Sequence, residues 1–123
     1  MHLKELCKQA HQIAKSKGFW DKNKNIPEKI MLCVTELAEA VEALRKNNRQ
    51  ISEKEWSKLR FTHLCNKNTF NNRWIKDSFE DEICDTFIRL ADLCGYMNID
   101  IEWQIINKMK FNRTREKLHG KKF

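Results

Sequence analysis

The chain of 123 residues contains only three glycines and a single proline. Sheets with many strands need many turns, and turns draw heavily on these two residue types. Their scarcity predicts a chain built from helices, and no segment shows the alternation of apolar and polar residues that is typical of a strand. At this length we expect one domain, covering residues 1–123.

Two helices are expected in the first third of the chain. The first ends at Gly18, and the second begins at Pro27, whose fixed φ suits a first helical turn, and continues to about Lys46. The expected apolar face of the first helix consists of Leu3, Leu6, Cys7, Ala10, Ile13 and Ala14. The expected core stripe of the second consists of Ile30, Val34, Leu37, Val41 and Leu44.

Two more helices are expected after residue 76. Asp77 or Ser78 would cap the third, Gly95 would loosen its end, and Asp100 would cap the fourth. Residues expected to face the core are Phe79, Ile83, Phe87, Leu90 and Cys94, with Ile88 and Ala91 on another side, and then Ile105, Ile106 and Met109. The fold class predicted from these patterns is an all-α, four-helix bundle.

The net charge of +7 is distributed unevenly. Residues 77–107 hold eight acidic groups against one basic group, whereas residues 45–76 and 108–123 carry net charges of +7 and +6. Acid beside base in one small fold suits a divalent cation together with a polyanionic ligand, although solvated helix surfaces produce the same pattern. The segment at about 47–76 is expected to be an insert between the second and third helices, and its aromatic residues are Trp56, Phe61, Phe70 and Trp74.

The cysteines and the first residues favour a cytoplasmic protein. No Cys-x-x-Cys pattern occurs among the five cysteines, and four of them fall on apolar helix faces, which indicates buried, reduced thiols; the four are Cys7, Cys33, Cys84 and Cys94. The pair His63 and Cys65 is weak support for zinc, which prefers four nitrogen or sulfur ligands. Lys4 and Glu5 stand where a signal peptide needs apolar residues, and no apolar run approaches the length of a membrane span.

Two helices each carry a pair of acids three residues apart, Glu36 with Glu39 and Glu82 with Asp85. Glutamates on a helix surface usually have a cation three or four residues away, but neither Glu36 nor Glu39 does. Helical geometry places both beside the core stripe, where like charges repel strongly. A hard divalent cation such as Mg²⁺ would relieve that repulsion, and two solvated acidic patches are the alternative.

Taken together, these motifs resemble the all-α, MazG-like nucleoside triphosphate pyrophosphohydrolases. The stretch from Glu36 to Arg45, followed by Glu82-Ile-Cys-Asp85, is similar to the family's Glu-x-x-Glu and Glu-x-x-Asp signature. Residues 108–115 and 119–123 resemble its Lys-x-x-x-Asn-x-x-Arg and His-Gly-Lys-Lys motifs, and residues 17–20 also match. The resemblance covers about two thirds of the chain.

The resemblance implies an enzyme that cleaves an NTP or dNTP into a monophosphate and pyrophosphate, as nucleotide-pool house-cleaning. It implies that Mg²⁺, with Mn²⁺ as an alternative, is held by the catalytic residues Glu36, Glu39, Glu82 and Asp85. Substrate binding would fall to Trp20, Lys108, Asn112, Arg115, Lys121 and Lys122. Lys108, Asn112 and Arg115 would share one helix face. Trp20 would either stack on a nucleobase or plug the bundle between the first and second helices.

The family also implies a homodimer or homotetramer. The 42 residues between Glu39 and Glu82 exceed the connection common in the family, which leaves the substrate and the role of the insert open. A second hypothesis is a non-catalytic helical module that binds nucleic acid through its basic insert and tail. That hypothesis leaves the carboxylates that lack cations unexplained.

Overall fold

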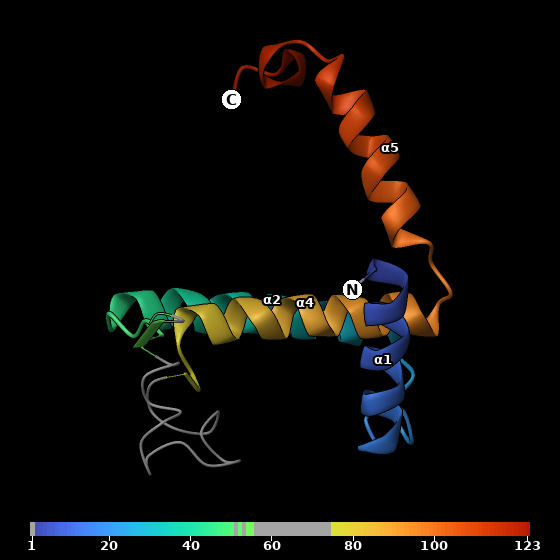
Figure 1. Ribbon diagram of the computed structural model, residues 1–123, viewed down its shortest axis with the longest axis vertical. Helices are drawn as coiled ribbons and strands as arrows, with labels where there is room; N and C mark the ends of the chain where they lie inside the picture. The colour runs from blue at the N-terminus through green and yellow to red at the C-terminus, as the bar shows by residue number, and fades with distance from the viewer. Residues whose placement is uncertain (1, 51, 53, 56–74) are drawn as a thin grey trace. The chain divides into compact units, whose positions relative to one another are not determined.

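The computed structural model describes residues 2–50, 52, 54–55 and 75–123. Within these ranges all regular elements are helical, which confirms the all-α prediction. No helix in the described part combines the length and hydrophobicity that crossing a membrane requires. The main elements are α1 (Leu3–Ser16), α2 (Ile26–Arg45), α4 (Phe79–Tyr96) and α5 (Ile101–Arg113), followed by a short 3-10 helix, η2 (Lys117–Gly120) (Figure 1).

Contacts along the chain define two compact units. The terminal unit consists of residues 1–23 and 91–123, and the central unit consists of residues 24–90. The division falls within α4, whose first turns belong to the central unit and whose last turns belong to the terminal unit. The organisation of the chain as one domain stays a prediction.

The helices begin where capping chemistry predicts. The Asn25 side chain accepts a hydrogen bond from the backbone N–H of Glu28 and so caps α2, which has Pro27 in its first turn. Ser78 Oγ accepts from the N–H of Asp81 at 3.2 Å, which identifies Ser78 as the cap of α4. Asp100 caps α5, as expected, by accepting from the N–H of Trp103 at 3.0 Å.

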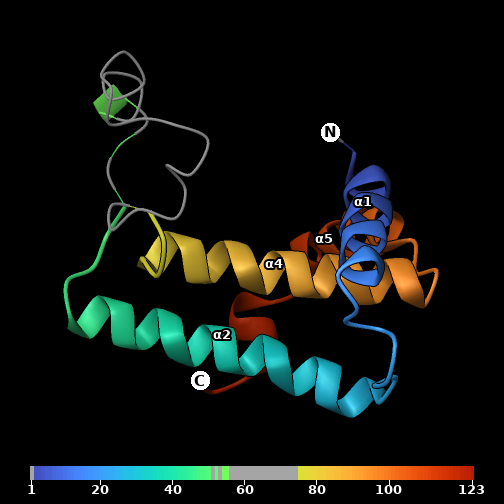
Figure 2. The same cartoon turned by 90° about the horizontal axis from the view of Figure 1, so that it is seen from below.

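In the central unit, α2 and the first turns of α4 run antiparallel, side by side (Figure 2). Beyond α2, the Asn48 side chain donates to the carbonyl of Asp77 at 2.7 Å, and the Asn48 carbonyl accepts from Phe79 at 3.0 Å. Arg49 pairs with Glu80 at 2.6 Å. These bonds join the chain at the two ends of the expected insert. The four aromatic residues of the insert, and His63 and Cys65, lie outside the described residues.

In the terminal unit, α1 packs on the last turns of α4 around Cys7, Ala10 and Ala91. A Cβ atom at Gly95 would lie 2.5 Å from the carbonyl oxygen of Cys7. Gly95 therefore permits a close approach of two helices rather than loosening the end of α4, which continues to Tyr96.

The expected core stripes are largely exposed, and this is the main correction to the predicted fold. The five stripe residues of α2 are each 45–48% exposed, whereas its buried residues are Cys33, Glu36, Ala40 and Ala43. The described helices of one chain cover only one side of α2, and that side carries small residues and a carboxylate. Further residues expected in the core but 41–66% exposed are Ile13, Phe87, Ile88, Leu90, Ile105, Ile106 and Met109.

Candidate functional site

Antiparallel packing in the central unit brings three of the four predicted carboxylates together. Glu36 extends from α2, and Glu82 and Asp85 extend from one face of α4. One carboxylate oxygen from each lies within 4.8 Å of the other two. Glu36 and Glu82 are nearly buried, with 7% and 5% of their surfaces exposed. We call these three residues the carboxylate cluster.

Glu39 lies at the margin of the carboxylate cluster. It is exposed on α2 and is not one of the three residues whose oxygens converge. Its charge nevertheless acts on Glu82 and is the largest electrostatic contribution to the pKa of that residue, after burial. The place of Glu39 in a four-carboxylate site stays a prediction.

The acid–base behaviour of the carboxylate cluster reflects crowded negative charge. Burial, the charge of Glu39 and a hydrogen bond to Glu36 together raise the pKa of Glu82 to about 7. Burial and the charges of Asp81 and Glu36 also raise the pKa of Asp85, against the lowering effect of Arg89. Both shifts mean that the ionised form is poorly stabilised by the surrounding protein.

Arg89 is a member of this site that sequence reasoning missed. Its Nε donates to a carboxylate oxygen of Glu36 at 2.5 Å, from a position one turn beyond Asp85 on α4. Spacing along one helix pairs Glu36 only with residues of α2, whereas Arg89 lies on the facing helix. A signal was present, because Arg89 is the one basic residue between residues 77 and 107.

A second acidic group overlaps the first and has a structural role. Asp77, Asp81 and Glu82 also place one oxygen each within 4.8 Å of the others. Asp77 is exposed and paired with Lys76 at 2.7 Å, and Asp81 accepts a hydrogen bond from the N–H of Asp77. These contacts hold the turn before α4, so the carboxylate cluster is the better candidate for binding an external cation.

The predicted phosphate-binding residues lie in the terminal unit. Lys108 and Asn112 are on α5, but this helix ends at Arg113, so Arg115 follows the helix rather than belonging to it. The residue after the end, Thr114, caps α5 and turns the chain. Lys108 Nζ and Arg115 Cζ still lie 5.1 and 5.4 Å from the ring of Phe111, which is therefore in contact with two cations.

Asn112 and the last lysines differ in their surroundings. The Asn112 side-chain oxygen is shielded from solvent and accepts no hydrogen bond in the described structure. An unpaired buried acceptor is costly, so a donor brought by a ligand would stabilise it. Lys121 and Lys122 follow η2 and are exposed.

Trp20 has a packing role in the terminal unit. Only 5% of its surface is exposed, its Nε1 donates to both oxygens of Asp92 at 2.9 and 3.1 Å, and its ring stacks on Tyr96 at 4.0 Å. His11 Nδ1 lies 2.8 Å from the same Asp92. These partners lie on α1 and α4, so Trp20 packs in the terminal unit but not between the first two helices, as the plugging alternative expected. Its contact with a nucleobase stays a prediction.

The predicted site residues therefore form two groups, in different units. The central unit holds Glu36, Glu39, Glu82 and Asp85, and the terminal unit holds the six residues expected to bind substrate. The union of both groups in one site stays a prediction. Comparison of the chain with protein-family models, curated proteins and solved structures finds no match.

Proposed function

We propose that this protein is a Mg²⁺-dependent nucleoside triphosphate pyrophosphohydrolase of the MazG-like type, acting in the cytoplasm. Its reaction would cleave an NTP or dNTP between the α and β phosphates, giving a monophosphate and pyrophosphate. The observation that carries the proposal is the carboxylate cluster, in which three carboxylates from two helices converge within 4.8 Å. The ordered motifs of the sequence support the same activity.

The donor atoms of the cluster fit a hard divalent cation. All of them are carboxylate oxygens, the ligand type that Mg²⁺ and Mn²⁺ prefer. Burial, followed by the charges of neighbouring carboxylates, raises the pKa values of Glu82 and Asp85. Glu36, Glu82 and Asp85 would hold the ion, with Glu39 at the margin. When bound, Mg²⁺ supplies neutralisation of the triphosphate charge and activation of a water.

The protein's own cations would serve the phosphates. Lys108 and Arg115 provide charged N–H donors suited to phosphate oxygens and to the negative charge that grows on the leaving pyrophosphate. Both lie against the exposed ring of Phe111, which limits the directions in which their long side chains extend. Asn112 would add its side-chain NH₂, which can donate to a phosphate oxygen.

The exposed stripe of α2 supports a homo-oligomer as part of the proposal. A row of large apolar side chains on one helix face, each nearly half exposed, is typical of a surface that another subunit covers. A homodimer or homotetramer would bury it. Sedimentation velocity of the wild type and of Val41→Asp tests this, because a charge in the stripe should shift the protein to a smaller species.

The activity is tested by incubating the full chain with a panel of NTPs and dNTPs and measuring pyrophosphate and orthophosphate separately. We expect pyrophosphate release that requires Mg²⁺ and stops on chelation. Glu39→Gln should abolish it, whereas Glu42→Gln is the matched control. Glu42 is also an exposed glutamate of α2, but it is paired with Arg45 and Lys46.

Absence of pyrophosphate with every nucleotide would overturn the proposal. If the same protein instead binds oligonucleotides with a strong dependence on salt, the nucleic-acid-binding alternative is correct. Orthophosphate as the only product would indicate a different bond cleavage, and would also contradict the proposed reaction.

A further inference from the structure

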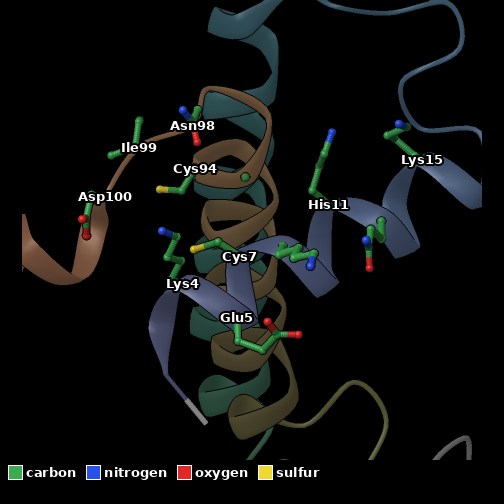
Figure 3. Close-up of a pocket in the computed structure, with 12 residues that line it drawn as sticks. Lys4, Glu5, Cys7, His11, Lys15, Cys94, Asn98, Ile99 and Asp100 are labelled. Carbon is green, nitrogen blue, oxygen red and sulfur yellow. The ribbon is translucent and has the colours of Figure 1, made fainter.

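Two thiols of the terminal unit lie close together. Cys7 lies on α1 and Cys94 on the last turns of α4, and Cys94 packs against the core cluster that contains Cys7. Figure 3 shows the two sulfur atoms next to one another, pointing to the same side. Both cysteines are free in this structure. Nothing in the proposed hydrolase reaction uses them.

Tight packing holds this pair together. Cys7 is 5% exposed and belongs to the core of the terminal unit, and Cys94 packs against that core. Gly95 follows Cys94 directly, and the backbone of Cys7 occupies the space where a side chain at residue 95 would be. The close approach of α1 and α4 therefore fixes the distance between the thiols, because it is set by the two backbones.

The pair is also accessible. Cys7 and Cys94 both line a cavity of about 720 Å³ in the terminal unit (Figure 3). The charged side chains that line the same cavity are of both signs, and the lysines outnumber the carboxylates; they are Lys4, Lys8 and Lys15 with Glu5 and Asp100. A small oxidant can thus reach thiols that are otherwise part of a core.

We propose that Cys7 and Cys94 form a reversible disulfide that locks α1 to the end of α4. The oxidant is a small disulfide of the glutathione type. Cys94, the more exposed of the two, attacks one sulfur of the oxidant, so that a mixed disulfide forms and one thiol leaves with the proton of Cys94. Cys7 then attacks the sulfur of Cys94, and a second thiol leaves with the proton of Cys7. Two electrons pass from the two protein thiols to the oxidant, which is reduced to two thiols.

The chemistry of the two thiols fits a slow structural lock rather than a rapid peroxide sensor. Burial raises the pKa of Cys7 and of Cys94, so little of either thiol is ionised at neutral pH. Because 86 residues separate the two cysteines in the chain, a bond between them would strongly restrict the unfolded state. The oxidised protein should therefore unfold at a higher temperature than the reduced protein.

The test is to incubate the folded full chain with oxidised glutathione, block the remaining thiols and map the tryptic peptides. We expect residues 5–8 joined to residues 90–108, each peptide containing one cysteine, with a raised midpoint of thermal unfolding. A reductant should restore both peptides and the original midpoint. Cys94→Ala should abolish the cross-link, and Cys84→Ser, which replaces an exposed cysteine of the same helix, should retain it.

Three results would overturn the proposal. They are a persistent glutathione adduct on Cys94 that Cys7 does not displace, an unchanged pair of peptides in the oxidised wild type, and a cross-link that forms only after denaturation. None of these readouts depends on nucleotide hydrolysis, so the outcome is independent of the proposed function.

Discussion

Helix α4 carries carboxylates in two contrasting surroundings. In the terminal unit, Asp92 accepts hydrogen bonds from the Trp20 indole at 2.9 and 3.1 Å and lies 2.8 Å from His11 Nδ1. In the central unit, burial raises the pKa values of Glu82 and Asp85, and the charges of neighbouring carboxylates raise them further. The protein thus supplies Asp92 with donors, whereas it buries Glu82 and Asp85, on the same helix, beside other negative charges.

The difference separates a structural acid from a candidate functional one. A buried carboxylate with its own donors stabilises the fold, because removing it leaves those donors unpaired. Carboxylates that repel one another lower stability, and a protein tolerates them where an external ligand compensates. Arg89 offsets part of this repulsion by pairing with Glu36. A bound cation would offset the repulsion that remains.

The largest expected effect is on turnover. Asp85→Asn should lower kcat/KM for pyrophosphate release by at least about a hundredfold, because stabilisation of charge by a bound metal is worth several kcal/mol. Asp92→Asn, the same change further along α4, should leave the folded protein within about tenfold of wild type. If kcat/KM per folded molecule falls equally in Asp85→Asn and Asp92→Asn, the distinction between a functional and a structural acid is wrong.

The next effect is on the pH dependence of stability without divalent cations. The pKa of Glu82 is raised from 4.5 to about 7 in the folded protein, so between these values the folded state binds more protons than the unfolded state. The free energy of unfolding should therefore fall as pH rises through this window, by at most about 3 kcal/mol. Urea unfolding at several pH values measures it. Glu82→Gln should flatten the slope, and an unchanged slope in that variant would show that Glu82 is not the cause.

A smaller effect on the free energy of unfolding is expected when Asp92, the carboxylate in the terminal unit, is removed. Asp92→Ala should lower the free energy of unfolding by about 2 kcal/mol, because the buried indole N–H of Trp20 loses its acceptor. Asp85→Ala should leave that free energy unchanged or raise it, since it removes a source of repulsion. Denaturant unfolding without metal measures the free energy of unfolding of both variants. A larger loss in Asp85→Ala than in Asp92→Ala would mean that Asp85, and not Asp92, is the structural acid.

The smallest effect is expected when the donor of the bond between Trp20 and Asp92 is removed, rather than its acceptor. Trp20→Phe keeps an aromatic ring to stack on Tyr96 but removes the N–H that Asp92 accepts, so a loss of about 1 kcal/mol is expected. The same measurement on Trp20→Phe combined with Asp92→Ala should show less than the sum of the two losses. Additive losses would mean that the hydrogen bond between these residues contributes little.

Local chemistry made much of this structure predictable. Pro27, Ser78 and Asp100 mark helix starts because capping depends on residues close in the sequence. The absence of a cation near Glu36 on its own helix pointed to a shared site with Glu82 and Asp85, although two solvated acidic patches fitted the same spacing, and the structure brings the three together.

Tertiary contacts account for what could not be predicted. Apolar spacing shows that α2 has a hydrophobic face but not whether the same chain covers it, and the described residues leave Val34 and Leu37 nearly half exposed. Arg89 reaches Glu36 across 53 positions of sequence, beyond any local rule. The sequence predicts that Gly95 loosens the end of a helix. The position of the Cys7 backbone shows instead that Gly95 permits the close approach of α1.

The hydrogen bonds that join Asn48 to Asp77 and Phe79 hold together the two ends of the segment between α2 and α4, where a foreign peptide could be inserted. The chain departs from and returns to one bonded place, and doubling the length of a loop adds only about 0.6 kcal/mol of closure entropy. By closure entropy alone, an affinity tag or a reporter peptide inserted between these residues would therefore cost little, and the bonds of Asn48 would keep α2 and α4 in register.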